Sequence, residues 1–252
     1  MRLFSLAQLA LLGAALTLAA CENKQADSPS TDSSSDEEQV QLTPAEALAR
    51  GSVAPSSESP YKRYGIERAH VHYEVSGFRR GVEDLYFDNW GRKEARYINV
   101  EDLTEQGTRP AKNIIVTNGS YMQMADLIAG RGNFMTEPVV DSLMKLKQVD
   151  AAEVISDSIM SRLGYTRQGE APILGIQTNV WHEPTTGTTL YAWKGIVLKQ
   201  EVKTPQHHHM VVAVSIDTTS PIPDSIFTAH KGVEYSPMPP RPGPGGGPPR
   251  QR

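Results

Sequence analysis

The sequence contains very little cysteine, with Cys21 as the single one among 252 residues. This excludes a disulfide within the chain and a metal site built from cysteines, so the folded part must be stabilised by packing. The sequence also lacks the G-x-S-x-G, H-E-x-x-H, phosphate-loop and dinucleotide-binding motifs. Its formal net charge of −4 gives no excess of basic residues for nucleic acid. We therefore expect a protein without enzymatic activity, cofactor or nucleic-acid partner.

The N-terminal region combines a positive charge at Arg2, a short apolar run from Leu9 to Leu16, and the sequence Leu18-Ala19-Ala20-Cys21. The apolar run is too short to stay in a membrane as a spanning helix, and the pattern is typical of an export signal. Leucine, two small residues and cysteine match the bacterial lipoprotein signal, which implies cleavage after residue 20 and acylation of Cys21. Several acyl chains anchor a protein firmly to a membrane. An ordinary secretory signal with an incidental cysteine is the alternative.

The residues after the signal predict a tether, one folded domain and a tail. Glu22 stands where enteric lipoproteins retained in the inner membrane have Asp, so we expect an outer-membrane location facing the periplasm. Residues 21–60 are rich in Ser, Asp, Glu and Pro, which predicts a disordered tether spanning roughly 35 Å. Residues 236–252 form a Pro/Gly-rich tail, also predicted to be disordered. The region between, 61–235, has the size of a single domain.

Alternation of apolar and polar residues predicts strands on both sides of this domain's centre. In residues 69–75, one face carries Ala, Val, Tyr and Val, and the other carries His70, His72 and Glu74. Comparable patterns predict about nine strands. They cover residues 69–75, 82–90, 94–100, 112–117, 120–124, 173–183, 188–195, 196–202 and 209–216.

The centre of the domain changes to a helical period. Apolar residues recur at helical spacing from Val139 to Leu146 behind Pro138, and a second helix is predicted from Asp150 to Leu163. Strands, then helices, then strands again predict an α+β, mainly β fold. It consists of one antiparallel sheet, with two or so helices packed on one face. A sheet of about nine strands must curl.

Three segments carry a resemblance to a known family: GVEDLYFDNWGRKEAR at 81–96, LYAWKGIVLKQEV at 190–202 and PIPDSIFTAHKGVE at 221–234. They resemble bacterial exported proteins related to the LolA/LolB-like and LppX-like lipoprotein carriers, over most of residues 66–234. The resemblance implies a strongly curved open half-barrel with helices across its concave face. It also implies an apolar cavity that accepts acyl chains.

Apolar side chains that suit such a cavity are concentrated in the predicted helical centre, where flexible methionines adapt to varied chains. The candidate ligand-binding residues are Met122, Met124, Leu127, Phe134, Met144, Met160 and Trp193. The alternative is that these side chains fill an irregular but dry core. The remaining large aromatic residues are expected mainly in strand packing, with a sugar or aromatic-ligand groove as the alternative. They are Trp90, Trp181 and Tyr191.

The histidines are the other conspicuous polar group. In the tract His207-His208-His209 only the first and third residues share a side of a strand, and His70 and His72 share a side with Glu74. Either set has side chains that zinc prefers. The solvated face of a strand has the same composition, so we predict no dedicated metal site.

Three functions are compatible with these observations. The first is an anchored binding protein that holds a lipid, an acyl-bearing ligand or a lipoprotein. The second is an envelope interaction or stress protein with a closed core. The third is a metal-binding lipoprotein, which requires His70, His72, His207, His209 and His182 to converge. The sequence leaves the oligomeric state open.

Overall fold

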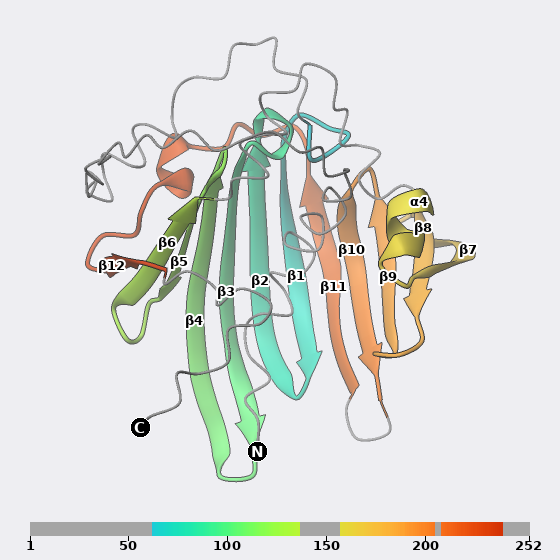
Figure 1. The fold of residues 1–252 in the computed structure, drawn as a ribbon, viewed down its shortest axis with the longest axis horizontal. Coiled ribbons are helices and arrows are strands. Elements are labelled where there is room, and N and C mark those ends of the chain that lie inside the picture. The colour runs from blue at the N-terminus through green and yellow to red at the C-terminus, as the bar shows by residue number, and fades with distance from the viewer. Residues whose placement is uncertain (1–61, 137–156, 205–207, 239–252) are drawn as a thin grey trace, which may run out of the picture. The chain divides into compact units, whose positions relative to one another are not determined.

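The computed structural model describes residues 62–136, 157–204 and 208–238, which form one large, open, curved sheet with few helices (Figure 1). The helical elements are α4 (Asp157–Arg162) and the 3-10 turns η2 (Asn89–Gly91) and η4 (Asp224–Phe227). No helix within the described ranges is long and apolar enough to cross a membrane. The strands are β1 (Ala69–Gly77), β2 (Arg79–Asp88), β3 (Lys93–Thr104), β4 (Gly107–Asn118), β5 (Tyr121–Asp126), β6 (Arg131–Thr136), β7 (Thr166–Ile173), β8 (Ile176–Glu183), β9 (Thr188–Trp193), β10 (Ile196–Lys203), β11 (His208–Asp217) and β12 (Glu234–Pro237).

The strand order is β12-β6-β5-β4-β3-β2-β1-β11-β10-β9-β8-β7. Strands β1 to β6 form one half of the sheet in chain order, from the middle of the sheet outward. Strands β7 to β11 form the other half, from its outer edge inward to β11, which pairs with β1. The predicted mainly β fold with one curved sheet is confirmed. The strand pairs are antiparallel as predicted except at β12, which runs parallel to β6 because the chain crosses the sheet before adding this strand.

Alternating side chains give the sheet two faces, here called face A and face B. Face A carries Val71, Tyr73 and Val75 of β1, and face B carries His70 and His72. The core cluster of face A consists of Tyr64, Ala69, Val71, Tyr73, Val75, Leu85, Phe87, Ile98, Val100, Ile196, Leu198, Val211 and Ala213. A smaller cluster on face B contains Ala95, Ile114, Val116, Ala125 and Phe227.

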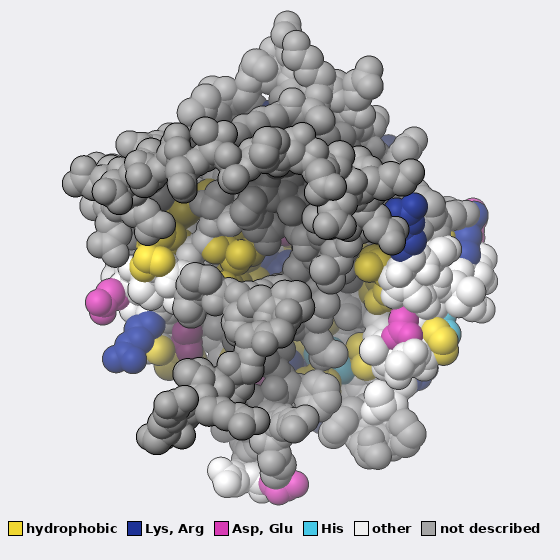
Figure 2. Space-filling model, in the orientation of Figure 1, with side chains coloured by type: hydrophobic (Ala, Val, Ile, Leu, Met, Phe, Trp, Pro, Cys, Tyr) yellow, Lys and Arg dark blue, Asp and Glu magenta, His cyan; other side chains and the backbone are white. Residues whose placement is uncertain are grey.

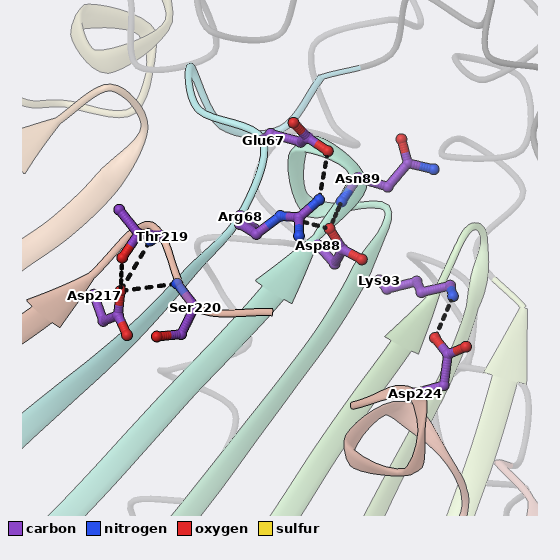
Figure 3. A network of polar contacts seen from close by, with 9 residues as sticks. All are labelled: Glu67, Arg68, Asp88, Asn89, Lys93, Asp217, Thr219, Ser220 and Asp224. Atoms are coloured by element: carbon purple, nitrogen blue, oxygen red, sulfur yellow. Dashed lines mark hydrogen bonds and ion pairs between the residues drawn. The ribbon is translucent and has the colours of Figure 1, made fainter. Parts of the chain in front are cut away.

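The C-terminal segment, residues 218–238, covers part of face B. Asp217 fixes its start by accepting hydrogen bonds from the backbone and hydroxyl of Thr219 and from the backbone of Ser220 (Figure 3). Phe227 of η4 is 3% exposed and packs in the face B cluster. Lys93 Nζ lies 2.7 Å from Asp224 Oδ1, which joins the segment to β3 (Figure 3).

The predicted strand over 120–124 is confirmed as β5, whereas the grouping of Met122, Met124 and Phe134 with the helical centre is wrong. Met122 and Met124 lie on β5, and Phe134 lies on β6, because these two strands pair as a hairpin. The first predicted helix, residues 138–146, lies outside the described residues. Within the second predicted helix, residues 157–162 form α4.

The predicted strand over 173–183 is divided by a turn. Leu174 and Gly175 have φ of 52° and 74°, and two successive residues with positive φ form a tight hairpin turn. β7 therefore ends at Ile173, and β8 begins at Ile176. The predicted turn at Asn118-Gly119 is confirmed between β4 and β5.

Candidate functional site

Face A is the larger apolar surface of the sheet. Its core cluster includes side chains from β1, β2, β3, β10 and β11, so it extends across the middle of the sheet on both sides of β1. Figure 2 shows acidic and basic side chains interspersed around the margin of one view of the molecule. The members of this cluster are 0–7% exposed, so face A holds the larger of the two buried apolar cores of the described residues.

A row of directly paired residues shows how far face A reaches. It runs through Ala111, Val100, Gly81, Val75, Val211, Gln200, Leu190 and Trp181, from β4 to β8. Directly paired residues on neighbouring strands share a face of the sheet. Trp181 therefore lies on the same face as the core cluster, although it stands four strands away from Val75.

Face A also holds buried charges. Glu83 of β2 is 2% exposed and is ion-paired with Arg96 of β3, and both pair across the sheet with members of the apolar cluster. Glu94 accepts hydrogen bonds of 2.8 Å from Arg63 Nη1 and from the Tyr64 hydroxyl. The two carboxylates and two guanidinium groups balance, which is how charges are tolerated away from water.

These charges control one another's protonation. Burial raises the pKa of Glu94, but attraction to Arg63 and Arg96 and the hydrogen bonds from Arg63 and Tyr64 outweigh it, so the pKa lies below its usual value. Burial lowers the pKa of Arg96, but the neighbouring acidic groups together outweigh it and hold the pKa above its usual value; they are Glu83, Tyr73, Glu94 and Tyr64. Burial raises the pKa of Tyr73, whose hydroxyl donates to the Val197 carbonyl. Glu94 and Arg96 thus keep their charges at neutral pH.

The segment before β1 brings Arg63 and Tyr64 to this network. The backbone N–H groups of Arg63 and Tyr64 both donate to the Trp90 carbonyl, at 2.8 and 3.2 Å. Gly91 has a φ of 82°, and a Cβ there would come within 2.6 Å of the Tyr64 ring. Glycine is therefore required for Tyr64 to pack over η2 and reach Glu94.

The predicted ligand-binding residues divide between the two faces. Met122 and Met124 lie on face A. They pair with Thr117 and Ile115 of β4, which in turn pair with the face A residues Glu94 and Arg96. Both are half-buried. Trp193 packs against the face A cluster.

The other predicted residues lie elsewhere. Phe134 pairs with Gln123, which pairs in turn with Val116 of the face B cluster, and Leu127 packs against the same cluster. Met160 is buried on α4. Met144 and the predicted acylation site, Cys21, lie outside the described residues.

The ligand-binding candidates chosen from the sequence did not include Trp181, which is 1% exposed. No acceptor within the described ranges lies within hydrogen-bond distance of its indole Nε1. Alternation along β8 places Trp181 and Val180 on opposite faces of the sheet. It does not show which face each of them takes, since Val180 is buried as well.

The histidines contact different partners. Asp84 Oδ1 lies 2.7 Å from His70 Nε2 and 2.8 Å from His72 Nδ1. The carboxylate that contacts both histidines therefore comes from Asp84 of β2, and not from Glu74. The remaining contacts are separate. His182 Nδ1 contacts the Thr189 hydroxyl, His208 Nε2 contacts Glu201, and His209 Nδ1 contacts the Ser76 carbonyl. His207 lies outside the described residues. Within the described part of the chain, no group of three or more metal-binding side chains could hold an ion.

The sequence matches no protein-family model and no curated protein. Among solved structures, it is similar to an uncharacterized conserved protein from Thermus thermophilus, with 12% identity, a TM-score of 0.42, and coverage of 77% of this chain and 98% of that chain. It is also similar to LprF from Mycobacterium bovis, with 14% identity, a TM-score of 0.30, and coverage of 71% and 96%. For MucB in the Pseudomonas aeruginosa MucA/MucB complex the values are 11%, 0.34, 75% and 62%. Similarity at this level concerns the fold.

Proposed function

We propose that this chain is a lipid-anchored protein of the bacterial envelope that binds an acyl-bearing ligand, either a lipid or a lipoprotein, on face A. Acylated Cys21 holds it on the outer membrane, facing the periplasm. It acts by binding and performs no catalysis. The tether of residues 21–60 gives the domain its reach into the periplasm.

The observation that carries the proposal is the extent of the apolar cluster on face A. The cluster crosses five strands, and the row through Val75 adds Leu190 and Trp181 beyond it. Burying a methylene group is worth about 0.8 kcal/mol, so a long acyl chain on such a surface gains on the order of 10 kcal/mol before the costs of binding. The half-buried Met122 and Met124 extend this face toward β5.

The test is native mass spectrometry of the non-acylated mature chain, residues 21–252 with Cys21→Ser, purified without detergent. We expect extra mass that disappears on organic extraction and matches a fatty acid or phospholipid. If the chain is bare, we expect it to take up lipid from phosphatidylglycerol vesicles. A bare chain that takes up no lipid contradicts the proposal and favours a closed core with a protein partner.

A matched pair of variants locates the ligand. Met124→Glu places a charge on face A at a half-buried position and is expected to reduce lipid uptake. Ile128→Glu places the same charge on a side chain that is 54% exposed in the turn after β5, and is expected to leave uptake unchanged. Equal uptake by both variants would exclude the β5 part of face A from the binding surface.

A further inference from the structure

Trp181 is a buried hydrogen-bond donor that finds no acceptor among the described residues. Its side chain is 1% exposed, and no acceptor among the described residues reaches Nε1. Buried polar groups in native proteins are almost always paired, because an unpaired one has lost its water and gained nothing in return. The indole can only donate, so the missing partner is an oxygen or another acceptor.

Trp181 has one charged and one apolar partner across the sheet, Arg167 of β7 and Leu190 of β9. Leu190, its direct partner on β9, is 1% exposed, and the same row continues to Val211 and Val75 of the face A cluster. The half-buried amide of Gln200 is the polar side chain in this row. The donor therefore lies at one end of a long apolar surface, on the side opposite to Met122 and Met124.

An apolar cluster with the Trp181 donor and Arg167 at one end suits an amphiphile whose polar end accepts a hydrogen bond. A hydrocarbon chain lies on the cluster while a carbonyl or carboxylate oxygen meets the indole. A ligand with an ammonium end offers donors and no acceptor, so it leaves the indole unpaired.

We propose that Trp181 Nε1 donates a hydrogen bond to the carbonyl or carboxylate oxygen of the acyl ligand, and so selects ligands that carry this acceptor. This inference rests on the proposed function. The acceptor belongs either to a free fatty acid or to an acyl ester, and the two sources share the same carbonyl chemistry. Trp181 is thus a specificity-determining residue for the acyl end of the ligand.

The experiment compares three amphiphiles with the same twelve-carbon chain: laurate, monolauroylglycerol and dodecylammonium. Each is titrated into the ¹⁵N-labelled mature chain carrying Cys21→Ser, and the indole N–H signals of the three tryptophans are followed by NMR. We expect the Trp181 proton to move downfield with laurate, with monolauroylglycerol or with both, because a hydrogen bond deshields the proton. We expect no downfield shift with dodecylammonium.

Affinities provide the second readout. Trp181→Phe keeps the ring and removes the N–H, so it should weaken binding of the acceptor-bearing amphiphile about tenfold. Binding of dodecylammonium should stay within a factor of about two, which also shows that the variant is folded. Trp90→Phe, the matched control on a half-buried tryptophan of η2 outside the face A cluster, should change none of the affinities.

The outcomes separate the two proposals. If none of the amphiphiles binds the unmodified Trp181 protein, the proposed function fails, and this inference fails with it. If the amphiphiles bind but Trp181→Phe affects all of them equally, or affects none, the selection by Trp181 is wrong and the acyl-binding function stands. A shift of the Trp181 proton in the laurate titration identifies the acceptor as a free acid, and a shift in the monolauroylglycerol titration identifies it as an ester.

Discussion

Glu83 and Arg96 are two charged residues within an apolar face, and each depends on the other. Removing one partner of a buried ion pair leaves an uncompensated charge and costs about 3–5 kcal/mol, whereas replacing both with neutral residues is often tolerated. We expect Arg96→Leu to lower the free energy of unfolding by that amount, measured by urea denaturation. Adding Glu83→Gln to Arg96→Leu should restore part of the loss. Additive losses in the double variant would show that the two side chains are not coupled.

Glu183 closes the turn between β8 and β9. Its carboxylate accepts from the backbone N–H groups of Thr185 and Thr186, at 2.8 and 2.7 Å, and from the Thr186 hydroxyl. These bonds, first the one from the Thr186 side chain, lower the pKa of Glu183 to about 2 from a usual value of 4.5. Because the folded pKa is the lower one, the stabilisation is complete above pH 4.5 and is lost as the pH falls through 2.

Glu183→Gln is therefore expected to lower the free energy of unfolding by about 1 kcal/mol at pH 7 and to flatten its decline between pH 4.5 and 2. The measurement is thermal unfolding followed by circular dichroism over this pH range. Glu170→Gln is the control, since Glu170 is half-exposed and its ion pair with Arg167 contributes little. An unchanged pH profile in Glu183→Gln would assign the acid sensitivity to other carboxylates.

At the scale of single residues, the sequence predicted positions better than partners. Alternation placed His70 and His72 on one side of a strand, which is correct. It also placed Glu74 on that side, which is correct, but the carboxylate that contacts both histidines is Asp84 of the neighbouring strand. Partners across strands depend on register, and register depends on pairing that one strand's sequence does not contain.

At the scale of elements, the strands that the sequence missed lie toward the edges of the sheet. β7 is exposed along almost its whole length, so it has no apolar face to produce alternation. β12 has four residues and ends in Pro237, and β6 is short. These strands are held by the neighbour they pair with, whereas β1, β2 and β11 carry buried residues at alternate positions and were predicted correctly.

The C-terminal segment is an element whose contribution is measurable. Phe227 is its deepest anchor, and removing a buried phenylalanine costs about 3–5 kcal/mol. We expect Phe227→Ala to lower the free energy of unfolding by that amount in urea denaturation. Asp224→Asn removes the neighbouring surface ion pair with Lys93 and should change stability little. Comparable losses in the two variants would mean that the segment is held by its charges.

At the scale of the whole molecule, local pattern predicts one large curved sheet but not the order of its strands. The two halves meet because β11 pairs with β1, and the paired residues, such as Val75 and Val211, are far apart in the sequence. Nothing near either strand specifies the other, since both are apolar strands that suit the middle of a sheet. Face A as a continuous surface exists only once this pairing is made.

The proposed binding on face A and the proposed acylation of Cys21 are linked, because a binding face serves the envelope only if the domain is retained there. Cys21→Ser removes the predicted acylation site and leaves face A untouched. Two or more acyl chains hold a protein on a membrane almost irreversibly, and none leaves only weak surface contacts. We expect the wild-type chain to sediment with bacterial membranes after a high-salt wash, and the Cys21→Ser chain to appear in the periplasmic fraction with unchanged affinity for laurate. A Cys21→Ser chain that still sediments would show that something other than acylation retains the protein, whereas a released chain that no longer binds laurate would make the membrane itself part of the binding site.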